Sequence, residues 1–158
     1  MLTTINTDAS WCPQTKVGAY AFWVRSDKFL LKKSGVFRKR CSNPSDAEVK
    51  CIINATKLTM RQDRGIKKII INTDSKLAIT VLTGGLVKPS VILRWRPLYK
   101  MFKNITHKRG VEVEFRWVKA HSHTGEARNW VNAWCDKEAR KQLRNQININ
   151  NDKEVEIN

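Results

Sequence analysis

The sequence lacks the features of secreted, membrane and metal-thiolate proteins. No apolar run approaches the length needed to cross a bilayer. The segment MLTTINTDAS has neither a basic nor an apolar stretch, so we expect no signal peptide, a cytoplasmic location and no membrane partner. The cysteines Cys12, Cys41, Cys51 and Cys135 show no C-x-x-C spacing. A zinc site is therefore not indicated, and free thiols are expected.

Acidic residues are scarce. The chain has 14 Asp and Glu against 30 Lys and Arg, which gives a net charge of +16. A field of this sign favours a polyanion as partner. Charge alone does not choose between RNA, DNA and anionic lipid, but no basic amphipathic helix favours a membrane. The 158 residues are enough for one domain with a substantial core.

Residue patterns along the chain predict the order β-β-β-α-β-α-α-β-α, that is, an α/β domain around one mixed sheet. Asn43 and Pro44 are suited to begin the first helix, and glycines end several elements. We expect a domain over residues 1–144 and a polar, Asn-rich, disordered tail over 145–158. The predicted strands are within 2–8, 16–26, 28–39, 66–74 and 111–118, and the predicted helices within 43–62, 75–82, 91–108 and 129–146.

The tetrapeptide INTD occurs twice, at the end of two β-like runs, and each copy ends on an aspartate, Asp8 or Asp74. If the two runs are adjacent central strands, both carboxylates lie at the edge of the sheet where α/β proteins bind ligands. Two close carboxylates repel each other, and a divalent cation between them would relieve this repulsion. Alternatively, an Asp after a strand simply caps the next helix, as Asp74 could do for the helix over 75–82.

Further acids and histidines are candidates for the same edge. Asp46 lies three residues after Asn43, so we assign it a local capping role. Glu48 lies close to the apolar face of that helix. A carboxylate is unfavourable there unless it has a partner, and a bound metal ion would be one. In the last helix Asp136 follows Asn132 by four residues, so the two share a face. The loop before it contains two histidines.

Together these residues resemble a type 1 ribonuclease H over roughly residues 1–144. Each piece alone is weak, but five of them occur in order. The pieces are TDAS at Asp8, AE at Glu48, NTDSKLAI at Asp74, WVKAH at His121 and NAWCDKEAR at Asp136.

The resemblance implies a mixed five-stranded sheet flanked by helices, and cleavage of the RNA strand of an RNA–DNA hybrid. It implies two Mg²⁺ ions, with Mn²⁺ possible, and products with 5′-phosphate and 3′-hydroxyl ends. Asp8, Glu48, Asp74 and Asp136 would bind the metals, and His121 would assist proton transfer or product release. The hybrid is the implied partner, and no obligate protein partner is implied.

The chain departs from the family's pattern at several positions. Ala9 stands where glycine is usual, and the loop after WVKAH is longer than usual, so His123 competes with His121 for the same role. The basic handle helix of some members is absent, and the helix over 91–108 could supply charge instead. The residues expected to contact the hybrid are Asn43, Ser45, Lys76, Asn132, Arg94 and Arg96, with additional backbone contacts from the basic run over 32–40.

Three other interpretations stay open. The chain could be a related nuclease or integrase-type protein that acts on DNA. It could be a non-catalytic nucleic-acid-binding module, although a pure binder has no need to gather carboxylates beside phosphates. It could also be a domain of a larger reverse-transcriptase polyprotein.

Overall fold

The computed structural model describes residues 1–119 and 127–157. The order of elements is as predicted. The strands are β1 (Leu2–Trp11), β2 (Gly18–Ser26), β3 (Leu30–Val36), β4 (Lys68–Thr73) and β5 (Glu112–Trp117), and the helices are α1 (Pro44–Met60), α2 (Lys76–Thr83), α3 (Pro89–His107) and α4 (Ala127–Ile157).

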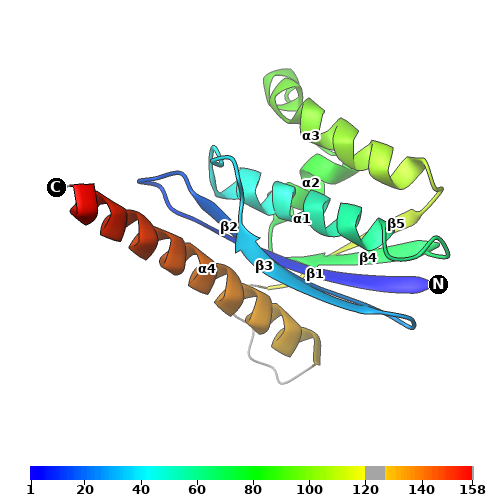
Figure 1. The fold of residues 1–158 in the computed structure, drawn as a ribbon. Coiled ribbons are helices and arrows are strands. Elements are labelled where there is room, and N and C mark those ends of the chain that lie inside the picture. Colours follow the sequence, from blue (N-terminus) through cyan, green and yellow to red (C-terminus); the bar gives the residue numbers. More distant parts are fainter. Residues whose placement is uncertain (120–126, 158) are drawn as a thin grey trace.

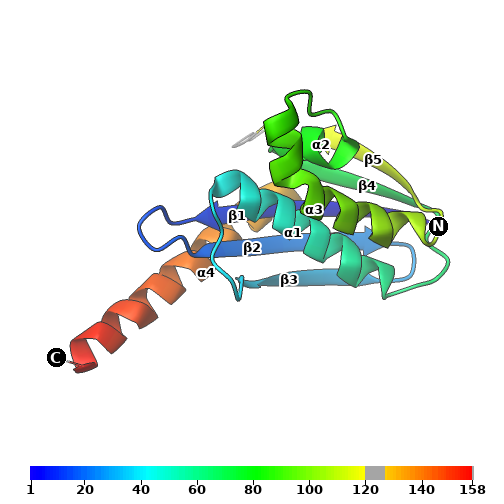
Figure 2. The same ribbon diagram turned by 90° about the horizontal axis from the view of Figure 1, so that it is seen from above.

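The five strands form one mixed sheet in the order β3-β2-β1-β4-β5. β1, β2 and β3 are an antiparallel meander, whereas β4 is parallel to both β1 and β5. Helices α1, α2 and α3 cover one face, and α4 crosses the opposite face over the meander (Figure 1). From above, α1 and α3 lie side by side (Figure 2). The predicted fold class, an α/β domain with a mixed five-stranded sheet, is confirmed.

The start of α1 follows the sequence signals. Asn43 is the N-cap, and its side-chain oxygen accepts a hydrogen bond of 2.8 Å from the Asp46 amide. Pro44 follows in the first turn, where its missing N–H costs nothing. The Asp46 carboxylate accepts from the Ser42 amide at 2.8 Å and from Lys50 Nζ at 2.9 Å. Asp46 therefore has the local structural role that its position predicts.

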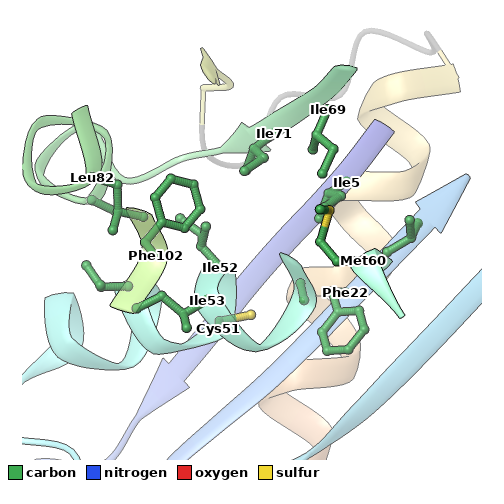
Figure 3. Packing of buried hydrophobic residues seen from close by; sticks show 14 of the residues in the cluster. Ile5, Phe22, Cys51, Ile52, Ile53, Met60, Ile69, Ile71, Leu82 and Phe102 are labelled. Carbon is green, nitrogen blue, oxygen red and sulfur yellow. The ribbon is translucent and has the colours of Figure 1, made fainter. Parts of the chain in front are cut away.

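The main core lies between the sheet and helices α1, α2 and α3 (Figure 3). Ile69 and Ile71 of β4 are fully buried in it beside Ile5 of β1. Ile70 points to the other face and is buried as well, as expected for a central strand that is covered on both sides. The helices contribute Ile52, Ile53, Leu82, Trp95 and Phe102. Burial of each such side chain stabilises the fold by about 1.5–3 kcal/mol.

The four cysteines are buried free thiols, as the lack of paired spacing predicts. Cys51 and Cys135 sit on opposite faces of the sheet, where their thiols approach the carbonyl oxygens of Asp8 (3.3 Å) and Asn6 (3.6 Å). In the described parts of the chain, no helix is both long and apolar enough to span a membrane.

The last helix is longer than the sequence predicts. Residues 145–157, expected to be a disordered tail, are helical, and the end of α4 extends past the sheet (Figures 1 and 2). Leu143 is buried, and Ile147 packs against the same small cluster with Cys12 and Ala19 of the β1–β2 hairpin. The spacing of four residues continues the apolar face of the helix beyond residue 144. This contact corrects the expectation that order ends at 144.

Replacing Ile147 with alanine should lower the free energy of unfolding by about 1 kcal/mol, because a partly buried side chain is removed. The same change at Ile149, which is 48% exposed, should have an effect within about 0.5 kcal/mol. Urea unfolding followed by circular dichroism measures both. Equal effects of the two substitutions would contradict the packing of this turn on the sheet.

Candidate active site

The two INTD copies end side by side in the centre of the sheet. β1 and β4 are parallel neighbours, and Asn6 lies opposite Asn72 in their register. The Asn72 side-chain amide donates a hydrogen bond of 3.0 Å to Asn6 Oδ1. Asp8 and Asp74 follow two residues later, so the same edge of the sheet presents both carboxylates. The two identical tetrapeptides thus bring Asp8 and Asp74 to the same edge of the sheet.

Helix α1 brings a third carboxylate to this edge. The Ala9 amide donates hydrogen bonds to Asp8 Oδ1 (2.9 Å) and to Glu48 Oε1 (3.3 Å), so one backbone N–H links strand and helix. One oxygen from each of Asp8, Glu48 and Asp74 lies within 4.8 Å of the others. Glu48 Oε2 is buried and has no hydrogen-bond partner among the described residues.

Helix capping does not account for Asp74. The cap of α2 is its neighbour Ser75, whose hydroxyl accepts a hydrogen bond of 3.1 Å from the Ala78 amide. The alternative that Asp74 caps this helix is therefore wrong. Its carboxylate instead lies with those of Asp8 and Glu48.

Burial and repulsion by neighbouring carboxylates raise the pKa values of Asp8 and Glu48. The pKa of Asp8 rises from 3.8 to about 8, first because the side chain is buried and then because Asp74 and Asp136 carry like charge. The pKa of Glu48 rises well above 4.5, again mainly through burial, with further contributions from Asp8 and Asp74. Without a cation, Asp8 therefore retains its proton at neutral pH.

The donor set fits a hard divalent cation. Carboxylate oxygens are the ligands that Mg²⁺ and Mn²⁺ prefer. The buried Glu48 Oε2, which has no hydrogen-bond donor among the described residues, is the kind of atom that a metal would satisfy. A bound cation would also replace the protons that the raised pKa values retain. Asp8, Glu48 and Asp74 are thus the residues that could hold a metal.

Asp136, the fourth predicted metal ligand, lies near this group and forms an ion pair on its own helix. It projects from α4, and its charge contributes to the raised pKa of Asp8. Its Oδ2 forms an ion pair of 3.0 Å with Arg140 Nη2, one helical turn later. Asp136 is not one of the three residues whose oxygens lie within 4.8 Å of one another. The sequence offered no sign of this pairing beyond the spacing of four residues.

The structure describes the predicted substrate-contact residues but not the predicted histidines. His121 and His123 lie outside the described residues. The Asn43 side chain is used in capping α1, and Ser45 is half-buried in the same turn. Asn132 is half-buried on α4, and its side-chain nitrogen is buried without a partner among the described residues.

The basic candidates are exposed. Arg94 and Arg96 lie on the surface of α3, while Trp95 between them is buried. The N-terminal halves of α1 and α3 lie toward the same end of the molecule (Figures 1 and 2). Lys76, in the first turn of α2, places its Nζ 4.4 Å from the centre of the Trp117 ring.

Trp117 also lies beside the site, although its sequence context assigns it no role beyond membership of the WVKAH motif. Alternation in β5 places it on the core face with Val113 and Phe115, yet its side chain is 47% exposed. Its indole Nε1 donates a hydrogen bond of 3.2 Å to the backbone carbonyl of Asp74. Its sequence signals are its place as the first residue of the WVKAH motif and its position at the end of β5, next to the strand that leads to Asp74.

Asp8→Asn should stabilise the metal-free protein at neutral pH. Between pH 3.8 and about 8 the folded protein binds more protons at Asp8 than the unfolded chain does, so its stability falls as the pH rises through this range. The free energy of unfolding of Asp8→Asn should therefore exceed that of the parent by an amount that grows from pH 4 to pH 8. At pH 8 the difference should exceed about 1 kcal/mol. Urea unfolding in a chelating buffer measures it.

Asp46→Asn is the matched control, since this buried carboxylate accepts from an amide and a lysine. That change should destabilise the protein. Mn²⁺ should raise the melting temperatures of the parent and of Asp46→Asn. The increase for Asp8→Asn should be much smaller. A stability loss in Asp8→Asn similar to that in Asp46→Asn would refute the electrostatic account of the cluster.

Solved structures with the same fold include several ribonucleases. RNase H1 from the halophilic archaeon Halobacterium salinarum superposes with a TM-score of 0.69 at 16% identity, over 92% of this chain and 99% of that one. LC11-RNase H1, solved in complex with an RNA/DNA hybrid, gives a TM-score of 0.69 at 15% identity over the same shares. An N-terminal RNase H domain from Mycobacterium tuberculosis gives 0.66 at 16% identity, over 90% of this chain and 94% of that one.

At these identities the likeness shows the fold alone. No curated protein matches the chain by sequence. A sequence model of the RNase H family, however, matches residues 2–144, which contain the whole carboxylate cluster and all five ordered motifs. The chain therefore belongs to the RNase H family.

Proposed function

We propose that this protein is an endonuclease that hydrolyses the RNA strand of RNA–DNA hybrids with two divalent metal ions, leaving 5′-phosphate and 3′-hydroxyl ends. The observation that carries the proposal is the convergence of Asp8, Glu48 and Asp74 within 4.8 Å in a chain of the RNase H family. The RNA/DNA hybrid that is bound in the fold's relative LC11-RNase H1 supports the substrate class.

The three carboxylates would hold Mg²⁺, or Mn²⁺ in its place. Bound divalent ions supply an activated water and stabilise the leaving oxygen of an in-line displacement. The Ala9 amide contributes by fixing one oxygen of Asp8 and one of Glu48, so that the ligand geometry is set before a substrate arrives. Since these acids must lose protons to bind a cation, metal affinity should rise with pH.

Asp136 would be the fourth metal-binding acid. Its ion pair with Arg140 links two half-exposed side chains, so it is weak enough to be exchanged for a stronger contact. His121 would assist proton transfer or product release, as the resemblance implies, and His123 is the alternative for this role. Asn132, one turn before Asp136 on α4, would contact the hybrid.

The net charge of +16 supports a polyanionic substrate. Asn43 and Ser45 in the first turn of α1, Lys76 in the first turn of α2, and Arg94 and Arg96 on α3 are the proposed contacts to the hybrid. Phosphate contacts fix the position of the duplex, and contacts to 2′-hydroxyls identify the RNA strand. Little base specificity is expected, because none of these residues is on a helix shaped to enter a major groove.

A cleavage assay on an end-labelled RNA–DNA hybrid tests the proposal. The parent protein should cut the RNA strand with Mg²⁺ or Mn²⁺, and EDTA should abolish cutting. Asp8→Asn should lower the rate by at least about a hundredfold, because the cluster loses a charged metal ligand. Asp63→Asn, a carboxylate in the turn after α1 that pairs with Lys28, should retain full activity.

Parallel substrates separate the alternatives. Cutting of duplex DNA in preference to the hybrid would favour the DNA-acting nuclease. Hybrid binding without cutting under either metal would favour the non-catalytic module. Loss of activity in Asp63→Asn as well as in Asp8→Asn would mean that the assay does not report on the cluster.

The basic contacts can be tested through the salt dependence of binding. The double change of Arg94 and Arg96 to glutamate should weaken hybrid binding at every salt concentration. It should also reduce the slope of log affinity against log salt by about two, if each arginine contacts one phosphate. Fluorescence anisotropy with a labelled hybrid, in EDTA to prevent cutting, gives both values.

The matched control is the double change of Arg61 and Arg64 to glutamate. These exposed arginines lie at the C-terminal end of α1, away from Glu48, and their reversal lowers the net charge by the same amount. The control should weaken binding less and leave the slope nearly unchanged. Equal effects of the two double changes would show that overall charge, and not contact by α3, determines affinity.

A further inference from the structure

Asp74 differs from the other two metal-binding candidates in how its backbone is held. Asp8 lies within β1, paired with Ala21 of β2, and Glu48 lies within α1. Asp74 comes after the last residue of β4 and before the cap of α2. Its position therefore depends on individual contacts and not on a continuous ladder of backbone hydrogen bonds.

Trp117, the last residue of β5, supplies one of these contacts. The strand register pairs Trp117 with Thr73, and the next residue, Val118, donates its amide to the Thr73 carbonyl at 2.9 Å. The Trp117 indole N–H then reaches the carbonyl of Asp74 itself at 3.2 Å. The end of β5 thus forms hydrogen bonds to the last residue of β4, Thr73, and to the residue after it, Asp74.

Packing in the core does not explain this tryptophan, because nearly half of its side chain is exposed. Its ring is instead covered by Lys76, whose Nζ lies 4.4 Å from the ring centre, a cation–π distance. The indole therefore contacts both sides of the turn that contains Asp74: the carbonyl of Asp74 through its N–H, and Lys76 through its face.

We propose that Trp117 is a positioning residue that, through its indole N–H, sets where the Asp74 carboxylate stands relative to Asp8 and Glu48. The inference rests on the proposed metal-dependent function. Mg²⁺ requires near-ideal octahedral geometry, so a displaced ligand lowers affinity. Groups that orient metal ligands typically change metal affinity by tenfold or more when they are removed.

Trp117→Phe tests the role, because it removes the indole N–H and keeps an aromatic ring and the net charge. Mn²⁺ binding to the chain without nucleic acid, measured by calorimetry, should weaken about tenfold. The Mg²⁺ concentration for half-maximal cleavage should rise by a similar factor. The KM for the hybrid at saturating Mg²⁺ should stay within about twofold of the parent value, because the lost contact acts on the metal ligand and not on the hybrid.

Trp130→Phe is the matched control. It makes the same chemical change at a tryptophan of α4 that is 62% exposed and stacks edge-on against Trp23. This variant should bind Mn²⁺ as the parent does. A structural effect of losing any surface indole would appear in both variants, whereas a positioning effect appears only in Trp117→Phe.

The unmodified protein provides an independent measurement. In ¹⁵N-labelled protein, the indole N–H resonance of Trp117 should shift during Mg²⁺ titration, because its acceptor is the backbone of a metal ligand. The Trp130 resonance should shift much less. This readout does not depend on whether Trp117→Phe folds.

Weaker Mn²⁺ binding in Trp117→Phe, with normal binding in Trp130→Phe, supports the positioning role. Unchanged affinity in Trp117→Phe, an unmoved indole resonance, or a parent protein that does not bind Mn²⁺ overturns it. A parent that binds Mn²⁺ but does not cut the hybrid refutes the proposed function, while the two variants still decide the role of Trp117.

Discussion

The carboxylates of Asp8, Glu48 and Asp74 repel one another, and the fold must hold them together against this repulsion. They meet because β1 and β4 are parallel and in register, and because α1, capped by Asn43, begins at Pro44 and so carries Glu48 to the same edge. Burial makes the repulsion costly, as the raised pKa of Asp8 shows. The sheet can hold such a cluster because β1 is covered by helices on both faces and β4 contributes fully buried residues such as Ile71 to the core.

The local parts of the fold could be read from the sequence, whereas contacts between distant segments could not. The cap at Asn43 and the buried run of β4 are short-range patterns, and each formed where the residues predict it. The tail was misjudged because its composition is polar. The relevant signal was the spacing of Leu143 and Ile147, and its meaning depends on the β1–β2 hairpin, which is more than a hundred residues away in sequence. Composition reports the average character of a segment and misses a single side chain that reaches a distant core.

The candidate site shows the same division. Ordered motifs predicted that Asp8, Glu48 and Asp74 belong together, and the parallel register explains why a repeated tetrapeptide marks the place. The sequence could not decide whether Asp74 caps α2, because the neighbouring serine is equally suited to that role. Nor could it show that Trp117 turns its N–H to Asp74, since strand alternation predicts a core position. Side-chain direction at the end of a strand depends on its neighbours in space.

The distribution of charge couples metal binding to substrate binding in the proposed function. A chain with a net charge of +16 attracts a polyanion over its whole surface, yet its proposed reaction centre is locally negative. A phosphate that approaches three carboxylates is repelled unless their charge is first reduced. Protons reduce it in the metal-free protein, as the pKa of Asp8 near 8 indicates, but a protonated acid is a poor ligand. Divalent cations reduce the negative charge while the carboxylates stay ionised as ligands. Binding of a cation must therefore strengthen binding of the hybrid. By linkage, binding of the hybrid must strengthen binding of the cation by the same free energy.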